Sequence, residues 1–268
     1  MSRTRVLASN ALAEQRVLVT GAGSGIGHAI ALRFAELGAH IVGLGRRKEP
    51  LDELVAEIEG LGGSAEAHPC DVRDVEQVED IVDRVGRSGG LHGLINNAGG
   101  QFFAPAEDIS QRGWSAVIDL NLNAVFAMTR AAYPFLREQG GSVVSISLSG
   151  VERGSMGLAH SVAARAGVLG LTRTLALEWA RDRIRVNCLG PGTVLTEAFL
   201  AGVTDGAVVD HLIEDATPLQ RATSADEVAE FAAYLCSDAG QMLTGQLLHV
   251  DGGAHLGSGL HLLPEENT

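Results

Sequence analysis

Residues 20–27 read TGAGSGIG, so that every second residue from Gly21 to Gly27 is a glycine. This stretch follows a short β-rich run at residues 16–20 and opens an amphipathic helical run at residues 25–37. Glycines let the backbone approach a bound pyrophosphate closely, while the free N–H groups and the positive end of a helix attract its charge. Because strand, loop and helix follow in the required order, we predict a dinucleotide-binding loop rather than a tight turn without a ligand.

The alternation of short apolar runs and amphipathic stretches continues along the chain. The expected strands are mostly continuous in their apolar residues, as in parallel sheets covered by helices on both faces. They lie at residues 16–20, 40–44, 91–96, 142–147, 184–188 and 247–250. Neither a Pro/Ser-rich linker nor a repeat divides the chain. We predict an α/β fold with a single doubly wound parallel sheet (Rossmann-like), in one domain over residues 1–268 that includes an N-terminal extension (1–14) and a C-terminal tail (257–268).

The composition agrees with this class and argues against several functions. The 34 glycines and the low aromatic content of 4% suit a fold with many short crossovers between tightly packed elements. The excess of 33 acidic over 20 basic residues gives a net charge of -13. Such a surface repels a polyanion, so we expect no nucleic-acid partner.

Cysteine spacing and hydropathy indicate the compartment. Cys70, Cys188 and Cys236 show no CxxC spacing, so we expect neither a disulfide framework nor a metal site. Residues 1–14 lack the apolar core of a signal peptide, and no run approaches the ~18 apolar residues that span a bilayer. The last residues, EENT, differ from a Ser-Lys-Leu-like peroxisomal signal. We expect a cytoplasmic protein that contacts no membrane.

The expected second strand is followed by a basic cluster that bears on the choice of cofactor. A chain that selects NAD usually ends this strand with an acid, which accepts from the ribose 2′-OH and would repel a 2′-phosphate. Here Gly45 stands at that position, and Arg46, Arg47 and Lys48 follow. Two guanidiniums can hold a phosphate in a forked geometry, so we infer NADP(H). The alternative is a solvated basic turn before the next helix.

The spacing TGxxxGxG resembles that of the short-chain dehydrogenase/reductase superfamily. Further stretches agree with it over nearly the whole chain: NNAG at 96–99, DV at 71–72, PG at 191–192 and DGG at 251–253. The resemblance implies that Asp71 and Val72 contact the adenine, residues 97–99 lie along the ribose, and residues 191–194 flank the nicotinamide. Asp71 and Asn97 are also turn formers, which does not exclude binding. The expected cofactor-binding set is Gly21, Ser24, Gly25, Ile26, Arg46, Arg47, Asp71, Val72, Asn97, Ala98, Gly99, Arg165, Pro191, Gly192 and Val194.

The residues that this superfamily normally uses for ketone chemistry are replaced. That chemistry needs a Tyr-x-x-x-Lys pair on one helix face, in which the ammonium lowers the pKa of the phenol. The matching positions hold Ser161 and Arg165, and Leu148 stands where the family serine is expected. The chain has only two tyrosines, Tyr133 and Tyr234, and we expect neither to face the nicotinamide. A serine hydroxyl is too weak an acid to replace the phenol, so ordinary alcohol dehydrogenation is disfavoured.

Reduction of a carbon–carbon double bond conjugated to a thioester needs hydrogen-bond donors for an enolate oxygen rather than a phenol. The expected catalytic set is Asn121, Asn123, Ser161 and Arg165. Asn121 matches the superfamily asparagine that shapes the active-site helix, although a purely structural role is the alternative. Ser147 and Ser149 flank Leu148, and a shifted loop would let one of them supply a hydroxyl.

Two stretches, residues 97–107 (NAGGQFFAPAE) and 159–167 (AHSVAARAG), resemble the corresponding parts of peroxisomal trans-2-enoyl-CoA reductases. The related dienoyl-CoA reductases also carry serine at the tyrosine position, and an asparagine two residues beyond the usual one matches Asn123. The resemblance implies NADPH-dependent reduction of an α,β-unsaturated acyl-CoA thioester, with hydride transfer to the β-carbon. Leu169 stands where the enoyl-CoA reductases have a tyrosine. A carbonyl or 3-hydroxyacyl-CoA oxidoreductase with a non-standard acid and a catalytically silent NADP-binding protein remain the alternatives.

The resemblance also implies a homo-oligomer, either a dimer or a tetramer. Family members associate through long helices and the last strand, so residues 126–136, 171–179 and 246–250 are the expected contacts. Residues 193–217 mix small and acidic residues without periodicity, which predicts a lid.

Overall fold

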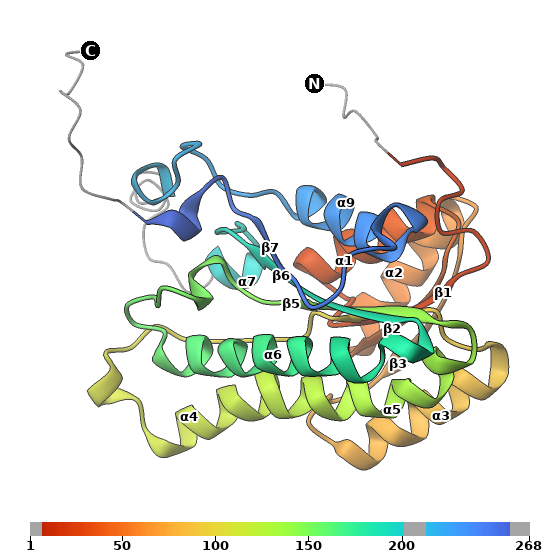
Figure 1. Ribbon diagram of the computed structural model, residues 1–268, viewed down its shortest axis with the longest axis horizontal. Coiled ribbons are helices and arrows are strands. Elements are labelled where there is room, and N and C mark those ends of the chain that lie inside the picture. Colours follow the sequence, from red (N-terminus) through yellow and green to blue (C-terminus); the bar gives the residue numbers. More distant parts are fainter. Residues whose placement is uncertain (1–6, 201–212, 258–268) are drawn as a thin grey trace.

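The computed structural model describes residues 7–200 and 213–257, along which strands and helices alternate (Figure 1). The strands are β1 (Arg16–Thr20), β2 (His40–Gly45), β3 (Ser64–Pro69), β4 (Gly93–Asn96), β5 (Gly141–Ile146), β6 (Ile184–Pro191) and β7 (Leu247–Val250). The α-helices are α1 (Gly25–Glu36), α2 (Lys48–Gly60), α3 (Val75–Gly89), α4 (Gln111–Ile118), α5 (Ala124–Gln139), α6 (Ala159–Glu178), α7 (Glu197–Leu200) and α9 (Ala225–Cys236). A π-helical turn, Asp119–Asn123, joins α4 to α5, and a 3-10 turn, Ala254–Leu256, follows β7.

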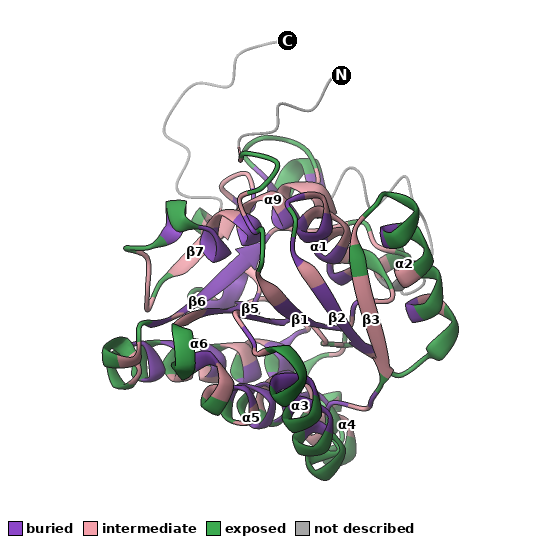
Figure 2. Ribbon diagram, turned by 90° about the vertical axis from the view of Figure 1, so that its right-hand side faces the viewer, coloured by how far each residue is buried: buried purple, intermediate pink, exposed green. Residues whose placement is uncertain are grey.

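The strands form one parallel sheet in the order β3-β2-β1-β4-β5-β6-β7. Helices α1, α2 and α9 cover one face, and α3, α4, α5 and α6 cover the other (Figure 2). The order reverses between β1 and β4, and ligands of open α/β sheets bind in the crevice outside the carboxyl ends of the strands at such a reversal. The predicted doubly wound α/β sheet is confirmed.

The central strand β1 shows why its apolar residues are continuous in the sequence. Successive side chains of a strand point to opposite faces of the sheet. Val17 and Val19 therefore pack in the core that contains Ile30 and Val228, from α1 and α9. Leu18 packs in the core on the other face, and all three β1 side chains are fully buried.

Two predicted boundaries differ from the structure. Leu12, in the expected N-terminal extension, is fully buried, and its N–H donates to the Leu37 carbonyl at 3.0 Å. Residues 7–14 therefore contribute to the domain. β6 runs beyond residue 188 to Pro191, so the sheet itself reaches the predicted nicotinamide segment. Residues 1–6, 201–212 of the predicted lid and 258–268 of the tail lie outside the described residues.

Within residues 7–200 and 213–257, no helix has both the length and the apolar character needed to cross a membrane.

Substituting Gly27→Ala should destabilise the fold, because a Cβ atom at this position would meet the Gly21 carbonyl oxygen at 2.3 Å. Such overpacking costs about 1–3 kcal/mol of the free energy of unfolding, which urea denaturation followed by circular dichroism measures. The matched control is Gly170→Ala in α6, where an added Cβ meets nothing within 4 Å. That change should raise stability by about 0.5–1 kcal/mol, and equal effects of the two substitutions would contradict the close approach at Gly27.

Candidate active site

The residues predicted to bind the cofactor lie at the carboxyl ends of five strands. The glycine-rich loop follows β1, Arg46 follows β2, Asp71 follows β3, Asn97 follows β4 and Gly192 follows β6. Because all strands run in parallel, these ends share one edge of the sheet. The structure therefore brings Gly21 and Gly192, which lie 171 positions apart in the sequence, to one edge of the sheet.

The glycine-rich loop packs directly against the loop after β4. Thr20 Oγ1 accepts hydrogen bonds from the backbone N–H groups of Asn97, at 3.0 Å, and Ala98, at 2.9 Å. Gly21 has a φ of +66°, and a Cβ atom on it would lie 2.9 Å from Asn97 Nδ2. A side chain at Gly21 or Gly27 would separate the two loops, so glycine is required at both positions by sterics.

The first turn of α1 is available to an anion. Ser24 precedes the helix with extended backbone, and its side chain makes no capping hydrogen bond. Gly25 and Ile26 open the helix, whose first N–H groups have no partner within the helix. Free N–H groups and the positive end of the helix dipole together form a phosphate site. The residues present therefore fit the pyrophosphate of a dinucleotide.

Asn97 supports the glycine-rich loop with its side chain. Its Nδ2 donates to the carbonyl oxygens of Thr20, at 2.9 Å, and Gly21, at 3.3 Å. Both bonds fix the loop, so the amide nitrogen is not directed to a ribose. A ribose contact from this segment would have to come from the backbone of residues 97–99.

A cavity of about 810 Å³ adjoins the glycine-rich loop. Its walls include Ser24 and Gly25 on one side, Val194 and Thr196 on the other, and Arg47 from the end of β2. Volumes of this order are typical of small-molecule sites. The predicted loop and the predicted nicotinamide segment therefore line one cavity.

Arg46 and Arg47 are both exposed at this edge of the sheet. Within the described residues, neither guanidinium makes a hydrogen bond or ion pair, whereas the neighbouring Lys48 pairs with Asp52 at 2.5 Å. Arg46 also lies close enough to Asp71 to help lower the pKa of that carboxyl group. Two unpaired guanidiniums beside the loop fit a phosphate better than a role in capping α2, because Arg47 stands at the N-cap position and makes no side-chain cap hydrogen bond.

Asp71 and Val72, which are expected to contact the adenine, both have contacts within the protein that limit what their side chains can offer to a ligand. Asp71 makes two hydrogen bonds with the Arg73 side chain, Nε to Oδ1 at 2.9 Å and Nη2 to Oδ2 at 2.6 Å. These bonds hold the pKa of Asp71 below its usual value despite partial burial. Val72 is only 6% exposed and packs in the core, so it offers mainly its backbone to a ligand.

Arg165 brings a buried positive charge to the loop after β4. Its Nη1 donates to the Ile146 carbonyl oxygen, and its Nη2 lies 2.9 Å from the position of a Cβ atom on Gly99. Its Nε is buried without a partner. Burial lowers the pKa of Arg165 to about 10, so the group stays charged at neutral pH. Arg165 therefore provides a fixed cation next to Gly99, as predicted for the lysine position.

Ser161 is fully buried, and its hydroxyl donates to Gln101 Oε1 at 2.6 Å. Gln101 lies in the stretch 97–107 that resembles the enoyl-CoA reductases, and no role was predicted for it. Because 60 residues separate the two side chains, no local pattern indicates their contact. Gln101 is exposed, so it covers the Ser161 hydroxyl from the solvent side.

His160 supports this arrangement from the next position. Its Nδ1 accepts from the Ser161 N–H at 2.8 Å, and its ring meets the edge of Phe102 with centroids 4.3 Å apart. Burial lowers the pKa of His160, which keeps the ring neutral at pH 7. A neutral, buried ring is a poor proton donor, so we assign His160 a structural role.

The two asparagines of the expected catalytic set have different environments. Asn121 is 2% exposed, accepts from the Gly100 N–H at 3.0 Å and donates to the Gly100 carbonyl at 2.8 Å. It therefore fixes the residue next to Gln101 and is a positioning residue. Asn123 is exposed and donates to Asp119 at 2.7 Å. Two residues along a helix turn the Asn123 side chain away from that of Asn121, and a catalytic role for Asn123 stays a prediction.

No alternative tyrosine reaches Ser161. The Tyr133 hydroxyl donates to Asp182 at 2.7 Å and its ring stacks against Trp179, while Tyr234 lies in α9 on the other face of the sheet. Ser147 is buried, and its hydroxyl has no partner within the described residues. The expected absence of a phenol at the site therefore agrees with the position of both tyrosines in the chain.

A larger hollow of about 920 Å³ lies between α3 and α5. Its lining includes the carboxylates of Glu79, Asp83 and Glu138, which repel phosphate groups. It also contains no part of the glycine-rich loop. The cavity beside Arg47 is therefore the better cofactor site, although it is smaller.

Comparisons with known proteins agree with this geometry. Residues 21–255 match the family model described as enoyl-(acyl carrier protein) reductase. The probable 2,4-dienoyl-CoA reductase of Bacillus subtilis strain 168 is 35% identical over 91% of this chain and 97% of its own length. The peroxisomal 2,4-dienoyl-CoA reductase of Arabidopsis thaliana is 37% identical over 94% and 88%. The 3-oxoacyl-[acyl-carrier-protein] reductase of Thermotoga maritima is 36% identical over 88% and 96%.

Solved structures show the same fold. A citronellol catabolism dehydrogenase from Pseudomonas aeruginosa matches with a TM-score of 0.84 and 34% identity, over 94% of this chain and 100% of its own. A protein assigned as an NAD(P)-dependent gluconate 5-dehydrogenase from Beutenbergia cavernae, with NADP bound at low occupancy, matches with a TM-score of 0.87 and 35% identity over 92% and 99%. Sheet order, glycine-rich loop and relatives together establish that this chain belongs to the short-chain dehydrogenase/reductase family of oxidoreductases.

Proposed function

We propose that this oxidoreductase uses NADPH to reduce a carbon–carbon double bond conjugated to the thioester of an acyl-CoA. The observation that carries the proposal is the pair Ser161 and Arg165, which retains a hydrogen-bond donor and a cation where a phenol and a lysine would serve ketone reduction. Two of the relatives are named as 2,4-dienoyl-CoA reductases, which supports the same substrate class. The relative named as a 3-oxoacyl reductase supports ketone reduction as the competing activity.

The mechanism requires stabilisation of negative charge on the thioester oxygen. The bound cofactor supplies a hydride to the β-carbon of the substrate, and the α-carbon then takes a proton. In this proposal the Ser161 hydroxyl turns from Gln101 Oε1 to the thioester oxygen, the Gln101 amide N–H donates to the same oxygen, and the charge of Arg165 favours the enolate. Gln101 is exposed, so water reaches this end of the site and supplies the proton.

The surroundings of Ser161 favour an apolar acyl group. The loop after β4 carries Phe102 and Phe103, and the loop after β5 carries Met156; all three side chains are exposed. A hydrogen bond of 3.0 Å from Ala104 N–H to the Gly157 carbonyl joins the two loops. Exposed apolar side chains gathered beside a polar site are typical of a surface that binds an apolar ligand.

The preference for NADPH rests on Arg46 and Arg47. Their free guanidiniums lie at the end of β2, where a 2′-phosphate would have to be held and where Gly45 offers no repelling carboxylate. Exposed Phe126 in α5 and Leu177 in α6 support the further proposal of a homo-oligomer through these helices.

The purified protein should oxidise NADPH in the presence of crotonyl-CoA or longer 2-enoyl-CoA thioesters. The decrease in absorbance of the reduced cofactor measures the rate, and mass spectrometry of the saturated product identifies the reduced bond. The 3-ketoacyl-CoA thioesters of the same chain lengths form the matched comparison. Turnover of the ketones alone would contradict the proposal, and binding of NADPH without any turnover would indicate a silent cofactor-binding protein.

Removal of both guanidiniums, in Arg46→Ala/Arg47→Ala, should raise the KM for NADPH while the KM for NADH changes little. Hydrogen bonds to a charged group are each worth about 1.5–3 kcal/mol, so we expect the loss of two such bonds to cause a rise of at least about 100-fold. Arg84→Ala, on the exposed face of α3, is the control for a general change of charge. Equal use of NADH and NADPH by the unmodified protein would refute the assignment.

Ser161→Ala and Gln101→Ala should each lower kcat for enoyl-CoA by about 100-fold, the usual effect of removing one oxyanion donor. The double variant should lose less than the product of the two effects, because the side chains share a hydrogen bond. Gln241→Ala is the control, since Gln241 is an exposed glutamine that hydrogen-bonds to Asp238, away from the site. Unchanged kcat in both single variants would remove these residues from the mechanism.

A further inference from the structure

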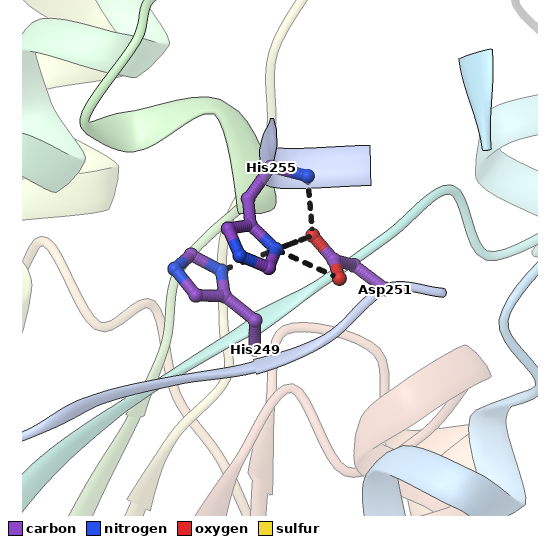
Figure 3. Close-up of side chains that lie close together, drawn as sticks. All are labelled: His249, Asp251 and His255. Atoms are coloured by element: carbon purple, nitrogen blue, oxygen red, sulfur yellow. Dashed lines mark hydrogen bonds and ion pairs between the residues drawn. The ribbon is translucent and has the colours of Figure 1, made fainter. Parts of the chain in front are cut away.

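Three side chains meet where β7 ends, and none of them has a role in the proposed reaction. His249 lies in β7, Asp251 follows this strand, and His255 lies in the 3-10 turn Ala254–Leu256 (Figure 3). Each offers one ligand atom, and these atoms all lie within 4.8 Å of one another. Two imidazoles and one carboxylate are a common ligand set for divalent transition metals in proteins.

The spacing of the ligand atoms fits a metal ion. His255 Nδ1 lies 3.0 Å from Asp251 Oδ2, and His249 Nδ1 lies 3.9 Å from the same oxygen. Two ligands at about 2.1 Å from a tetrahedral ion are separated by roughly 3.4 Å, which these two distances bracket. The imidazole rings are stacked, with centroids 4.0 Å apart and planes within 7°, and both Nδ1 atoms face the carboxylate (Figure 3). Small side-chain rotations would direct both nitrogens to one ion.

His249 has an unused ligand atom. Its Nδ1 is buried and makes no hydrogen bond within the described residues. A buried polar atom without a partner costs about 1–3 kcal/mol, and a bound ion would remove that cost. The other nitrogen, Nε2, lies 4.0 Å from the Glu152 carboxylate. Metal-bound histidines usually donate their second N–H to such a group, which leaves Nδ1 of His249 for the ion.

The Asp251 carboxylate is held in place by the backbone. It is only 3% exposed, and it accepts hydrogen bonds from the backbone N–H groups of Gly253, at 3.0 Å, and His255, at 2.7 Å. These bonds fix the orientation of the carboxylate, whose oxygens have further lone pairs for a cation.

We propose that His249, Asp251 and His255 bind one divalent transition metal ion, of which Zn²⁺ is the representative, with solvent completing the coordination. One carboxylate and two imidazoles favour Zn²⁺, Co²⁺ or Ni²⁺ over Mg²⁺ or Ca²⁺, which need mainly oxygen ligands. The ion would tie the end of β7 to the turn that follows it. Its role is structural, because none of the three ligands has a role in the proposed reaction.

The site also adjoins the predicted nicotinamide segment. A Cβ atom on Gly190 would lie 3.1 Å from His249 Nδ1, and one on Gly192 would lie 3.0 Å from the Asp251 backbone. Gly190 immediately precedes Pro191, the last residue of β6. A metal ion at the end of β7 would therefore make the residues that pack against segment 191–194 more rigid.

Calorimetric titration of the untagged, EDTA-treated full chain with ZnCl₂ tests the proposal. We expect one Zn²⁺ per chain and a melting temperature that rises with Zn²⁺ concentration, since a ligand of the folded state stabilises it. His255→Gln and His249→Gln should each weaken binding by at least about 100-fold, more than the usual effect of removing an outer partner of a ligand. Glu152→Gln should weaken binding by about 10- to 100-fold.

His28→Gln is the matched control, because His28 also lies beside a carboxylate, 3.0 Å from Glu57, but has no third ligand among the described residues. This variant should bind Zn²⁺ as the unmodified chain does. Circular dichroism without metal verifies that each variant is folded, and the Glu152 variant, which keeps all three ligands, retains the test if a histidine variant does not fold. Absence of Zn²⁺ binding, or binding that is equal in all variants, would overturn the proposal.

Discussion

The close approach of two loops, those after β1 and β4, is the constraint on which the site depends. Thr20 Oγ1 accepts from two backbone N–H groups of the β4 loop, and the Asn97 side chain donates back to the glycine-rich loop. Gly21 and Gly27 make this possible because neither can carry a Cβ atom without a clash. The same contact opens the start of α1 to phosphate and places Gly99 next to the buried charge of Arg165. The hydrogen bonds between these two loops thus position the glycine-rich loop relative to α6, which carries Arg165.

The sequence predicted those features that depend on neighbours along the chain. The glycine-rich loop, the arginines after β2 and the Ser161–Arg165 pair, spaced by one helical turn, are all local patterns. Their placement at one edge follows from parallel strands. Contacts between residues far apart in the sequence were not predictable in the same way. The Ser161 hydroxyl donates to Gln101, and the Asn121 amide makes hydrogen bonds to both the N–H and the carbonyl of Gly100. The burial of Leu12 was not predictable either, because the stretch VLASNALAE at residues 6–14 is too short and irregular to show the period of a strand or of an amphipathic helix.

The histidine cluster is a different case, because its signal is visible in the sequence. His249, Asp251 and His255 follow the spacing H-x-D-x-x-x-H, and the last two are four residues apart. The expectation of no metal site came from cysteine spacing alone, which does not cover histidine and carboxylate ligands. The spacing alone is weak evidence for a metal site, because the three side chains converge only if a strand ends near Asp251 and a turn follows it. The structure supplies that condition.

The unpaired Arg46 and Arg47 also bear on how fast an anionic ligand arrives. The chain carries a net charge of -13, so an approaching polyanion meets a repulsive field over much of the surface. The exposed guanidiniums interrupt this field at the mouth of the cavity, where low-dielectric walls focus it. Salt screens the long-range repulsion and the local attraction together, but the local attraction acts within about 8–10 Å and is screened less. The positive charges of Arg46 and Arg47 therefore guide a phosphorylated ligand to the cavity of an otherwise negatively charged protein. The rate of encounter depends on ionic strength for the same reason.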